Sequence, residues 1–361
     1  MRRDLFLEYF PVPKYLELPN VGIDVSDNCI RFIELIKNGG GFQLGKHGKK
    51  QLASGSKDYT RDETIDNSNL RHELLKTREE NSFESVKASL PEDQAYFLRL
   101  RLPPIDASAI RGAVELQIED HVPYAATEVV FDYEVVNVDD KTGHIDVTVA
   151  VTPKSIAEKY LAEFNLARLS VPIMMIESEA VARAVVPRTS HDNYIVVNIG
   201  KNKTVISVVS DGAVWISDTV KAGGNLLTSL IVKYLNVDPL TAGDVKYGDG
   251  FSDLKNNSVL EPLALGLSSI RDEIIRHQLY WKNNKEETLS GKGDIAQVLL
   301  CGEDANIPGI DCYLSSSLKV ATVIANPWIN VESFEKHIPE LTRRESLQYA
   351  TAIGLALNNL P

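Results

Sequence analysis

Apolar and polar positions near the start of the chain alternate in a way that predicts two strands joined by a tight turn. The run 21–25 (VGIDV) is apolar except for Asp24, a short polar turn follows it, and residues 30–35 alternate between apolar and polar. Alternation with a period of two is typical of a strand with one buried face. A third strand begins at 42–44, whereas residues 46–66 have no periodicity and predict an exposed loop or a ragged sheet edge.

The same arrangement recurs in the second half of the chain. The apolar run 194–200 enters a polar turn at 201–203, and the apolar run 204–209 leaves it. Asn198 has the place in this hairpin that Asp24 has in the first, near the end of the leading strand. Such an internal repeat predicts two similar halves.

A different pattern separates the two hairpins. Between residues 95 and 169 the order is strand, helix, strand, strand, helix, which predicts a small α+β unit. Three helices, one strand and a closing helix are predicted later in the chain, at 225–235, 238–247, 259–281, 295–301 and 345–358.

Composition places the chain among ordinary globular proteins. Its 361 residues, of which 43% are hydrophobic and 24% charged, suffice for two to three domains. No apolar run approaches the roughly 18 residues of a membrane-spanning helix, and the first residues do not form a secretory signal. The cysteines Cys29, Cys301 and Cys312 form no C-x-x-C pair, which favours a reducing compartment. We therefore expect a cytoplasmic protein without direct membrane insertion.

Charge and histidine spacing argue against two further classes of ligand. The net charge of -12 leaves no basic stripe for phosphates along DNA or RNA, so a nucleic-acid partner is not expected. The seven histidines occur singly, without a spacing such as H-E-x-x-H, so a histidine-based metal site is not expected either.

The two hairpin turns are candidates for holding a phosphate chain. Backbone N–H groups in tight turns can approach phosphate oxygens closely, and two facing turns would form a clamp. Asp24 could then hold a hydrated Mg²⁺, which usually meets a protein through one or two carboxylates. Taken alone, each hairpin is explained better as an ordinary connection between strands.

Three later segments contain residues suited to a nucleotide. Gly302 follows a predicted strand and would let the backbone approach a flat ligand. Gly223 and Gly224 precede a helix whose free N–H groups favour an anion. Asp244 and Lys246, two positions apart on a helix, could contact a ribose. A plain loop and a solvated helix face explain these residues equally well.

The order of these segments resembles that of the actin-like ATPase superfamily, whose members bind ATP between two related halves. Within it the chain most resembles the PilM family of type IV pilus assembly, with the FtsA cell-division family as nearest relative. The resemblance covers nearly the whole chain, since residues 22–35 and 195–225 match the two phosphate segments and 299–309 the adenosine segment. The place of the inserted unit is also that of FtsA and PilM.

The resemblance implies that ATP and Mg²⁺ bind between the two halves. It implies Asp24 as the metal residue and carries over no catalytic residue. The residues that it implies for nucleotide binding are Asp24, Ser26, Asp27, Asn28, Arg31, Asn198, Gly200, Lys201, Asn202, Thr204, Gly223, Gly224, Asp244, Lys246, Gly302, Glu303 and Ala305.

The sequence departs from the superfamily pattern at two important places. Asn198 stands where an Asp is usual, so a neutral carbonyl replaces a carboxylate that would order the metal or the attacking water. Glu303 and Asp304 replace a Gly-rich pair and add bulk and negative charge near the implied nucleotide. We therefore expect ATP binding, or even a nucleotide-free scaffold, rather than efficient hydrolysis.

The resemblance predicts an α/β, actin-like (ribonuclease H-like) fold of two lobes with an inserted α+β subdomain of the FtsA/PilM type. Residues 1–94 and 170–190 would form the first lobe, 95–169 the inserted subdomain, and 191–361 the second lobe.

The resemblance also implies a function in the inner-membrane platform of the type IV pilus. The protein would stay cytoplasmic, peripheral to the inner membrane, by binding the N-terminal cytoplasmic tail of a PilN-like single-span protein, and self-association is a further expectation. The tail would lie in a groove beside the inserted unit, near the strands at 98–102 and 131–135.

Two alternatives remain open. An FtsA-like cell-division protein typically ends in a membrane-binding amphipathic helix, and the last residues of the sequence, 357–361, do not suggest one. A small-molecule kinase of the same superfamily would need a carboxylate near the second turn, where this chain has Asn198.

Overall fold

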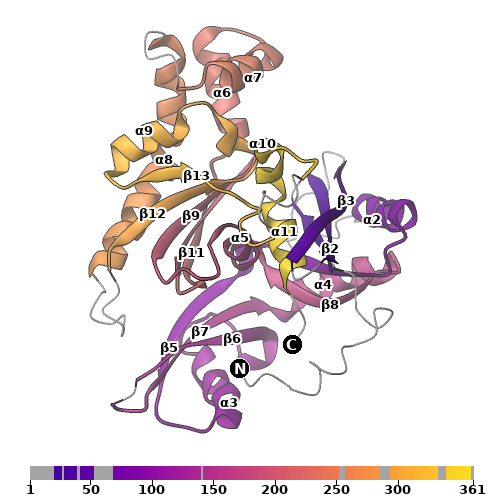
Figure 1. The fold of residues 1–361 in the computed structure, drawn as a ribbon, viewed down its shortest axis with the longest axis vertical. Coiled ribbons are helices and arrows are strands. Elements are labelled where there is room, and N and C mark those ends of the chain that lie inside the picture. Colours follow the sequence, from indigo (N-terminus) through magenta and orange to yellow (C-terminus); the bar gives the residue numbers. More distant parts are fainter. Residues whose placement is uncertain are drawn as a thin grey trace.

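The fold was analysed in a computed structural model (Figure 1) that describes residues 20–26, 28–38, 41–52, 68–139, 141–251, 257–283, 293–331 and 339–358. Three separate β-sheets organise these residues. In the described part of the chain, no helix combines the length and apolar character needed to cross a bilayer.

The first sheet contains the first predicted hairpin. Its strand order is β3-β2-β1-β4-β8, in which β1 pairs antiparallel with β2 and parallel with β4. The strands are β1 (Asn20–Val25), β2 (Cys29–Asn38), β3 (Gly41–Gln51), β4 (Ser85–Leu90) and β8 (Ser170–Ile176).

Residues 53–66 of the predicted loop or ragged sheet edge lie outside the described residues, and for residues 46–51, which belong to the edge strand β3, the loop is wrong. These residues continue β3 because their backbone pairs antiparallel with β2, as in Ile30 opposite Lys50. Ladder hydrogen bonds do not depend on side-chain periodicity, so a polar edge strand carries only a weak sequence signal.

The second sheet repeats the topology of the first. Its order is β11-β10-β9-β12-β13, again with three antiparallel strands followed by two parallel ones. The second predicted hairpin is therefore confirmed as β9 and β10. The strands are β9 (Asn193–Ile199), β10 (Thr204–Ser210), β11 (Ala213–Val220), β12 (Ile295–Cys301) and β13 (Thr322–Ile324).

The unit between the hairpins has the predicted order of elements. A three-stranded sheet, β5-β7-β6, packs one face against α3 through a core that includes Leu100, Val149 and Val114. Its elements are β5 (Tyr96–Leu102), α3 (Ala107–Ile118), β6 (Val129–Val138), β7 (Ile145–Pro153) and α4 (Lys154–Leu166). Figure 1 shows the three-stranded sheet and α3 at the end of the molecule opposite to α6 and α7, with α4 beside β8 of the first sheet.

The helices α5 (Glu177–Val185) and α11 (Ala350–Leu357) pack against each other beside the first sheet. Their backbones come so close that a Cβ atom on Gly354 would overlap the carbonyl of Ala180. Helix α11 also lies on β1, where Gly22 meets the carbonyl of Ala352 in the same way. The final helix thus packs on the sheet formed by the beginning of the chain. The lobe boundaries given above stay a prediction.

The remaining helices surround the two five-stranded sheets. Helix α2 lies on the side of the first sheet, and α6, α7, α8, α9 and α10 lie on the side of the second (Figure 1). They are α2 (Ser68–Asn81), α6 (Gly224–Leu235), α7 (Pro239–Gly248), α8 (Asn257–Asn283), α9 (Ile310–Leu318) and α10 (Arg343–Ser346).

Candidate functional site

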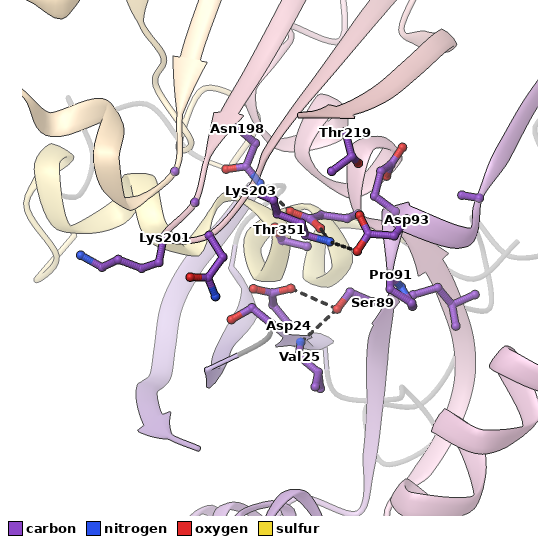
Figure 2. Close-up of a pocket in the computed structure, with 18 of the residues that line it drawn as sticks. Asp24, Val25, Ser89, Pro91, Asp93, Asn198, Lys201, Lys203, Thr219 and Thr351 are labelled. Carbon is purple, nitrogen blue, oxygen red and sulfur yellow. Dashed lines mark hydrogen bonds and ion pairs between the residues drawn. The ribbon is translucent and has the colours of Figure 1, made fainter. Parts of the chain in front are cut away.

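A cavity of about 660 Å³ lies where the two hairpin turns approach each other (Figure 2). Its lining comes from the turns after β1 and β9, the end of β4, the start of α5 and the residues after β12. We call this cavity the cleft. The two turns that the sequence suggested as a clamp therefore do face one space.

Asp24 lies at the first-sheet side of the cleft and is 6% exposed. Its carboxylate accepts a hydrogen bond from Ser89 Oγ at 3.1 Å and lies 3.5 Å from Arg31 Nη1. Arg31 is the register partner of Asp24 in the β1–β2 ladder, so strand pairing brings the two together. Burial raises the pKa of Asp24, and the attraction of Arg31 only partly opposes that effect.

Glu177 is a cleft residue that the sequence interpretation missed. It begins α5 directly after β8, and its Oε1 accepts a hydrogen bond from Asn198 Nδ2 at 2.7 Å. Lys203 reaches Asp93 at 3.2 Å and Glu177 at 3.8 Å. Burial, opposed by Lys203, raises the pKa of Glu177 to about 7. The available signal was a carboxylate at a strand-to-helix junction, which is where such sheets place functional side chains.

The second turn is fixed to the start of α6 by backbone hydrogen bonds. The amide of Gly224 donates to the carbonyl of Gly200 at 2.9 Å, and that of Asn225 donates to the carbonyl of Lys201 at 2.8 Å. A Cβ atom on Gly223 would overlap the Gly200 carbonyl, which explains the glycine. Two of the N–H groups at the beginning of α6 are therefore used by the chain itself, although such groups are a ready site for a phosphate.

Glu303 carries a carboxylate that three cations surround. Its Oε2 lies 3.0 Å from Arg31 Nη2 and 3.1 Å from Lys49 Nζ, and its Oε1 lies 3.3 Å from Lys201 Nζ. Burial alone would raise the pKa of Glu303, but Lys201, Lys49 and Arg31 outweigh it and hold that pKa at about 2. This carboxylate is therefore ionised throughout the physiological pH range.

Asp304 lies behind Glu303 with no exposed surface. Lys246 Nζ is 2.7 Å from its Oδ1, and the hydroxyl of Tyr247 donates to the same oxygen at 2.8 Å. The carboxylate lies so close to Gly224 that a Cβ atom on that residue would overlap it. Burial lowers the pKa of Lys246, and the attraction of Asp304 opposes that shift.

The structure separates the residues of the predicted nucleotide site into three groups. Those that line the cleft are Asp24, Ser26, Asn28, Arg31, Asn198, Gly200, Lys201, Asn202, Gly302 and Glu303. Those outside its lining are the buried Thr204, Gly223, Gly224, Lys246 and Ala305 and the exposed Asp244. Asp27 lies outside the described residues. Their roles in nucleotide binding stay predictions.

This conformation does not fit the predicted ATP and Mg²⁺. The carboxylate of Asp24, the predicted metal residue, already faces the guanidinium of Arg31. Three cations that could attract a phosphate, Arg31, Lys49 and Lys201, already surround Glu303, and Lys203 pairs with Asp93 and Glu177. A phosphate chain would have to displace the Glu303 carboxylate, because two anions cannot share these cations at close range without strong repulsion.

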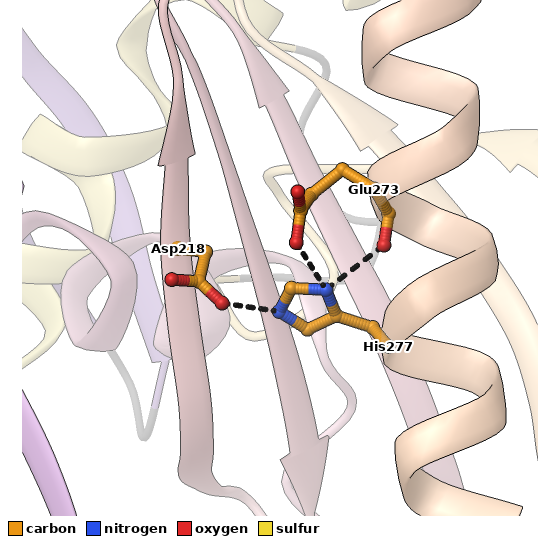
Figure 3. Close-up of side chains that lie close together, drawn as sticks. All are labelled: Asp218, Glu273 and His277. Atoms are coloured by element: carbon orange, nitrogen blue, oxygen red, sulfur yellow. Dashed lines mark hydrogen bonds and ion pairs between the residues drawn. The ribbon is translucent and has the colours of Figure 1, made fainter.

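A second group of ionisable side chains lies between β11 and α8 (Figure 3). His277 is 3% exposed, with Nε2 3.3 Å from Asp218 Oδ2 and Nδ1 3.2 Å from Glu273 Oε1. The three side chains are close enough for a metal ion, but the two carboxylates lie against opposite ring nitrogens. They flank the imidazole and do not converge on one point, so we interpret the group as a polar link between sheet and helix.

Comparisons with known proteins agree on one fold. A family model described as "Type IV pilus assembly protein PilM" matches residues 22–360. The chain is similar to a solved structure of the PilM-PilN type IV pilus biogenesis complex, with a TM-score of 0.74 at 18% identity over 93% of this chain and 97% of that one.

Two further structures are similar over most of their length. Ethanolamine utilization protein EutJ from Carboxydothermus hydrogenoformans gives a TM-score of 0.52 at 15% identity, covering 96% of this chain and 91% of that one. MreB5 of Spiroplasma citri bound to ADP gives 0.52 at 13% identity, covering 87% and 93%. Likenesses at such identities concern the fold alone, and they confirm the predicted actin-like fold.

Proposed function

The chain belongs to the PilM family of type IV pilus assembly proteins, and we propose from this that it is a cytoplasmic scaffold that binds the N-terminal tail of a PilN-like membrane protein. The observation that carries the proposal is the match to the family model over residues 22–360. The likeness to a PilM–PilN complex over 93% of the chain supports it. In this proposal the bound tail keeps the protein at the inner membrane.

The leucines at 98–102 are not suitable anchors for the tail. Leu98, Leu100 and Leu102 are at most 8% exposed, because they fill the core between the three-stranded sheet and α3. The three leucines are therefore excluded as anchors, and the expected groove along that strand stays a prediction for its other side chains. Side chains committed to a core cannot also contact a peptide without unfolding the unit.

Strand β6 is a better candidate for the tail site. It lies at the edge of the β5-β7-β6 sheet and, among the described residues, pairs with β7 alone. Val130 and Val135 are 39% and 43% exposed, and Asp132 and Glu134 are exposed too. An extended peptide can add to such an edge, with apolar anchors supplying affinity. Cytoplasmic segments next to a membrane span are rich in Lys and Arg, which suits the two carboxylates.

We do not expect the cleft to hydrolyse ATP efficiently. Asn198 supplies an amide and not a carboxylate, and that amide donates to Glu177. A general base needs a basic atom within hydrogen-bond reach of the attacking water, and Asn cannot accept a proton. The neighbouring carboxylate of Glu177 is already engaged by Asn198 at 2.7 Å and Lys203 at 3.8 Å. Phosphate release from Mg-ATP should therefore stay near the level of buffer alone.

The proposal is tested with a fluorescent synthetic peptide that carries the N-terminal cytoplasmic tail of a PilN protein. Fluorescence anisotropy with the full chain should give saturable binding. Val130→Asp and Val135→Asp should each weaken binding about tenfold, because they place a charge on the apolar contact. The matched control is Leu116→Asp on α3, whose side chain is 83% exposed and should leave binding unchanged.

Absence of saturable binding by the unmodified chain would refute tail capture. Binding of an FtsZ C-terminal tail in place of the PilN tail would favour the FtsA-like alternative. Loss of binding in Leu116→Asp but not in the β6 variants would show that the tail binds elsewhere than at β6. Sedimentation velocity over a range of protein concentrations tests the expected self-association.

A further inference from the structure

The cleft contains an anion that belongs to the chain itself. Four separate segments meet around this anion, the Glu303 carboxylate: Arg31 comes from β2, Lys49 from β3, Lys201 from the turn after β9, and Glu303 from the short 3-10 helix (Glu303–Asn306) after β12. All three cations lie within 3.3 Å of the Glu303 carboxylate. A carboxylate held by an Arg and two Lys has the kind of charge-assisted partners that proteins use for phosphate groups.

The neighbouring contacts use the groups at the start of α6 that could otherwise bind a phosphate. The N–H groups of Gly224 and Asn225 bind carbonyls of the second turn, and Asp304 with Lys246 occupies the space beside Gly224. Lys201 Nζ is also 3.8 Å from Asp304 Oδ2. The second turn and the start of α6, both predicted to bind phosphate, are thus held together by backbone carbonyl oxygens and by the carboxylate of Asp304.

We propose that Glu303 is a built-in substitute for a phosphate group: it ties the first-sheet side of the cleft to the second-sheet side and excludes a polyphosphate ligand while it is in place. Arg31 and Lys49 belong to the first sheet, whereas Glu303 and Lys201 follow strands of the second. The cleft is therefore held together without nucleotide. This inference does not depend on tail binding, and its test uses no tail peptide.

The charges around Glu303 determine what its removal should do. In Glu303→Gln the side chain keeps its size but loses its charge, so Arg31, Lys49 and Lys201 face one another with less compensation. Asp24 remains 3.5 Å from Arg31, and Lys49 keeps its hydrogen bond to Gln348 at 3.2 Å. The excess positive charge then attracts an anion with several closely spaced charges. Tripolyphosphate is such an anion, and adenosine is the matched uncharged probe.

The experiment compares thermal unfolding of the full chain, Glu303→Gln and Glu80→Gln, each with and without tripolyphosphate, Mg-free ATP or adenosine. Glu80 is the control because its carboxylate pairs with Lys50 on the outside of the first sheet. Without ligand, only Glu303→Gln should melt several degrees lower. Tripolyphosphate and ATP should restore that loss, and their affinity for Glu303→Gln should exceed that for the unmodified chain at least about tenfold. Adenosine should have no effect.

Each other outcome overturns the proposal. Equal melting of Glu303→Gln and the unmodified chain would show that Glu303 does not tie the cleft. Equal tripolyphosphate affinity, or no restoration of stability by either polyphosphate, would show that Glu303 does not replace a phosphate. If Glu303→Gln does not fold, Glu303→Asp keeps the charge but withdraws it by one methylene. It should then bind tripolyphosphate more tightly than the unmodified chain, and failure to do so overturns the proposal as well.

Discussion

Arg31 and Glu303 form an ion pair of 3.0 Å across the cleft although 272 positions separate them in the chain. Arg31 also faces Asp24 at 3.5 Å, so one buried guanidinium contacts the carboxylate of Asp24 in β1 and that of Glu303 after β12. Arginine suits this position because its planar group offers several donors at once. The pair links the two five-stranded sheets across the cleft without a ligand.

Lys246→Met should be strongly destabilising. Lys246 is 2% exposed and is the cation closest to the fully buried Asp304, so its loss leaves a buried carboxylate with little compensation. Breaking such a buried pair costs about 3–5 kcal/mol of the free energy of unfolding. Urea denaturation measures the change. Lys246→Met combined with Asp304→Asn should cost less than Lys246→Met alone, because no unpaired charge remains.

The control for that substitution is Lys154→Met. Lys154 pairs with Glu158 at 3.8 Å on the surface of α4, and both side chains are more than half exposed. Its removal should change the free energy of unfolding by less than about 0.5 kcal/mol. Equal effects of the two Lys→Met substitutions would contradict the buried pair.

Glu177→Gln should change how stability depends on pH. The pKa of Glu177 is raised from 4.5 to about 7 in the folded protein, so folding favours its protonated form. Its contribution to stability is therefore present below pH 4.5 and is lost as the pH rises through 7. Gln does not titrate, so the stability of the variant relative to the unmodified chain should rise by about 1–3 kcal/mol between pH 5 and pH 8.

Denaturant titrations at pH 5, 6, 7 and 8 measure this difference. Glu80→Gln is again the control, because the pKa of Glu80 is lowered by its hydrogen bond to Lys50 and the group does not titrate in that range. A Glu177→Gln curve that runs parallel to that of the unmodified chain would be inconsistent with the raised pKa.

Gly354→Ala should disrupt the packing of α11 on α5. The added methyl group would overlap the backbone carbonyl of Ala180, and backbone atoms of two packed helices cannot move apart locally. We expect a loss of more than about 3 kcal/mol, or failure to fold. Gly112→Ala in α3 meets no atom within 4 Å and should stabilise by about 0.5–1 kcal/mol through helix propensity. Similar melting temperatures for the two variants would disprove the close contact.

His277→Gln tests the polar link between β11 and α8. Glu273 and His277 are both buried, so the substitution leaves the Glu273 carboxylate with one partner fewer and should cost about 1–3 kcal/mol. Asp218→Asn should cost less, because the Asp218 side chain is 58% exposed. Zn²⁺ should shift the melting temperature of the unmodified chain and of His277→Gln equally. A Zn²⁺ stabilisation that disappears in His277→Gln would identify a metal site there.

The two hairpins and the inserted unit could be predicted because their signals are local. Residues 21–25 and 194–200 are short, mainly apolar runs that end in polar turns, so neighbouring residues suffice to define them. The polar end of β3 and the position of the leucines in β5 could not be predicted so well. Edge pairing and the choice of which sheet face is buried depend on segments distant in sequence.

The sequence by itself determined the repeated strand-turn-strand pattern, the position of Asp24 and Asn198, and the presence of two acidic residues after β12. Only the tertiary structure decided that Glu303 meets Arg31, Lys49 and Lys201, that Asp304 pairs with Lys246, and that Glu177 enters the cleft. The physical reason is that a charge acts on whatever lies within a few ångströms. Those neighbours come from strands that meet only when both sheets have formed.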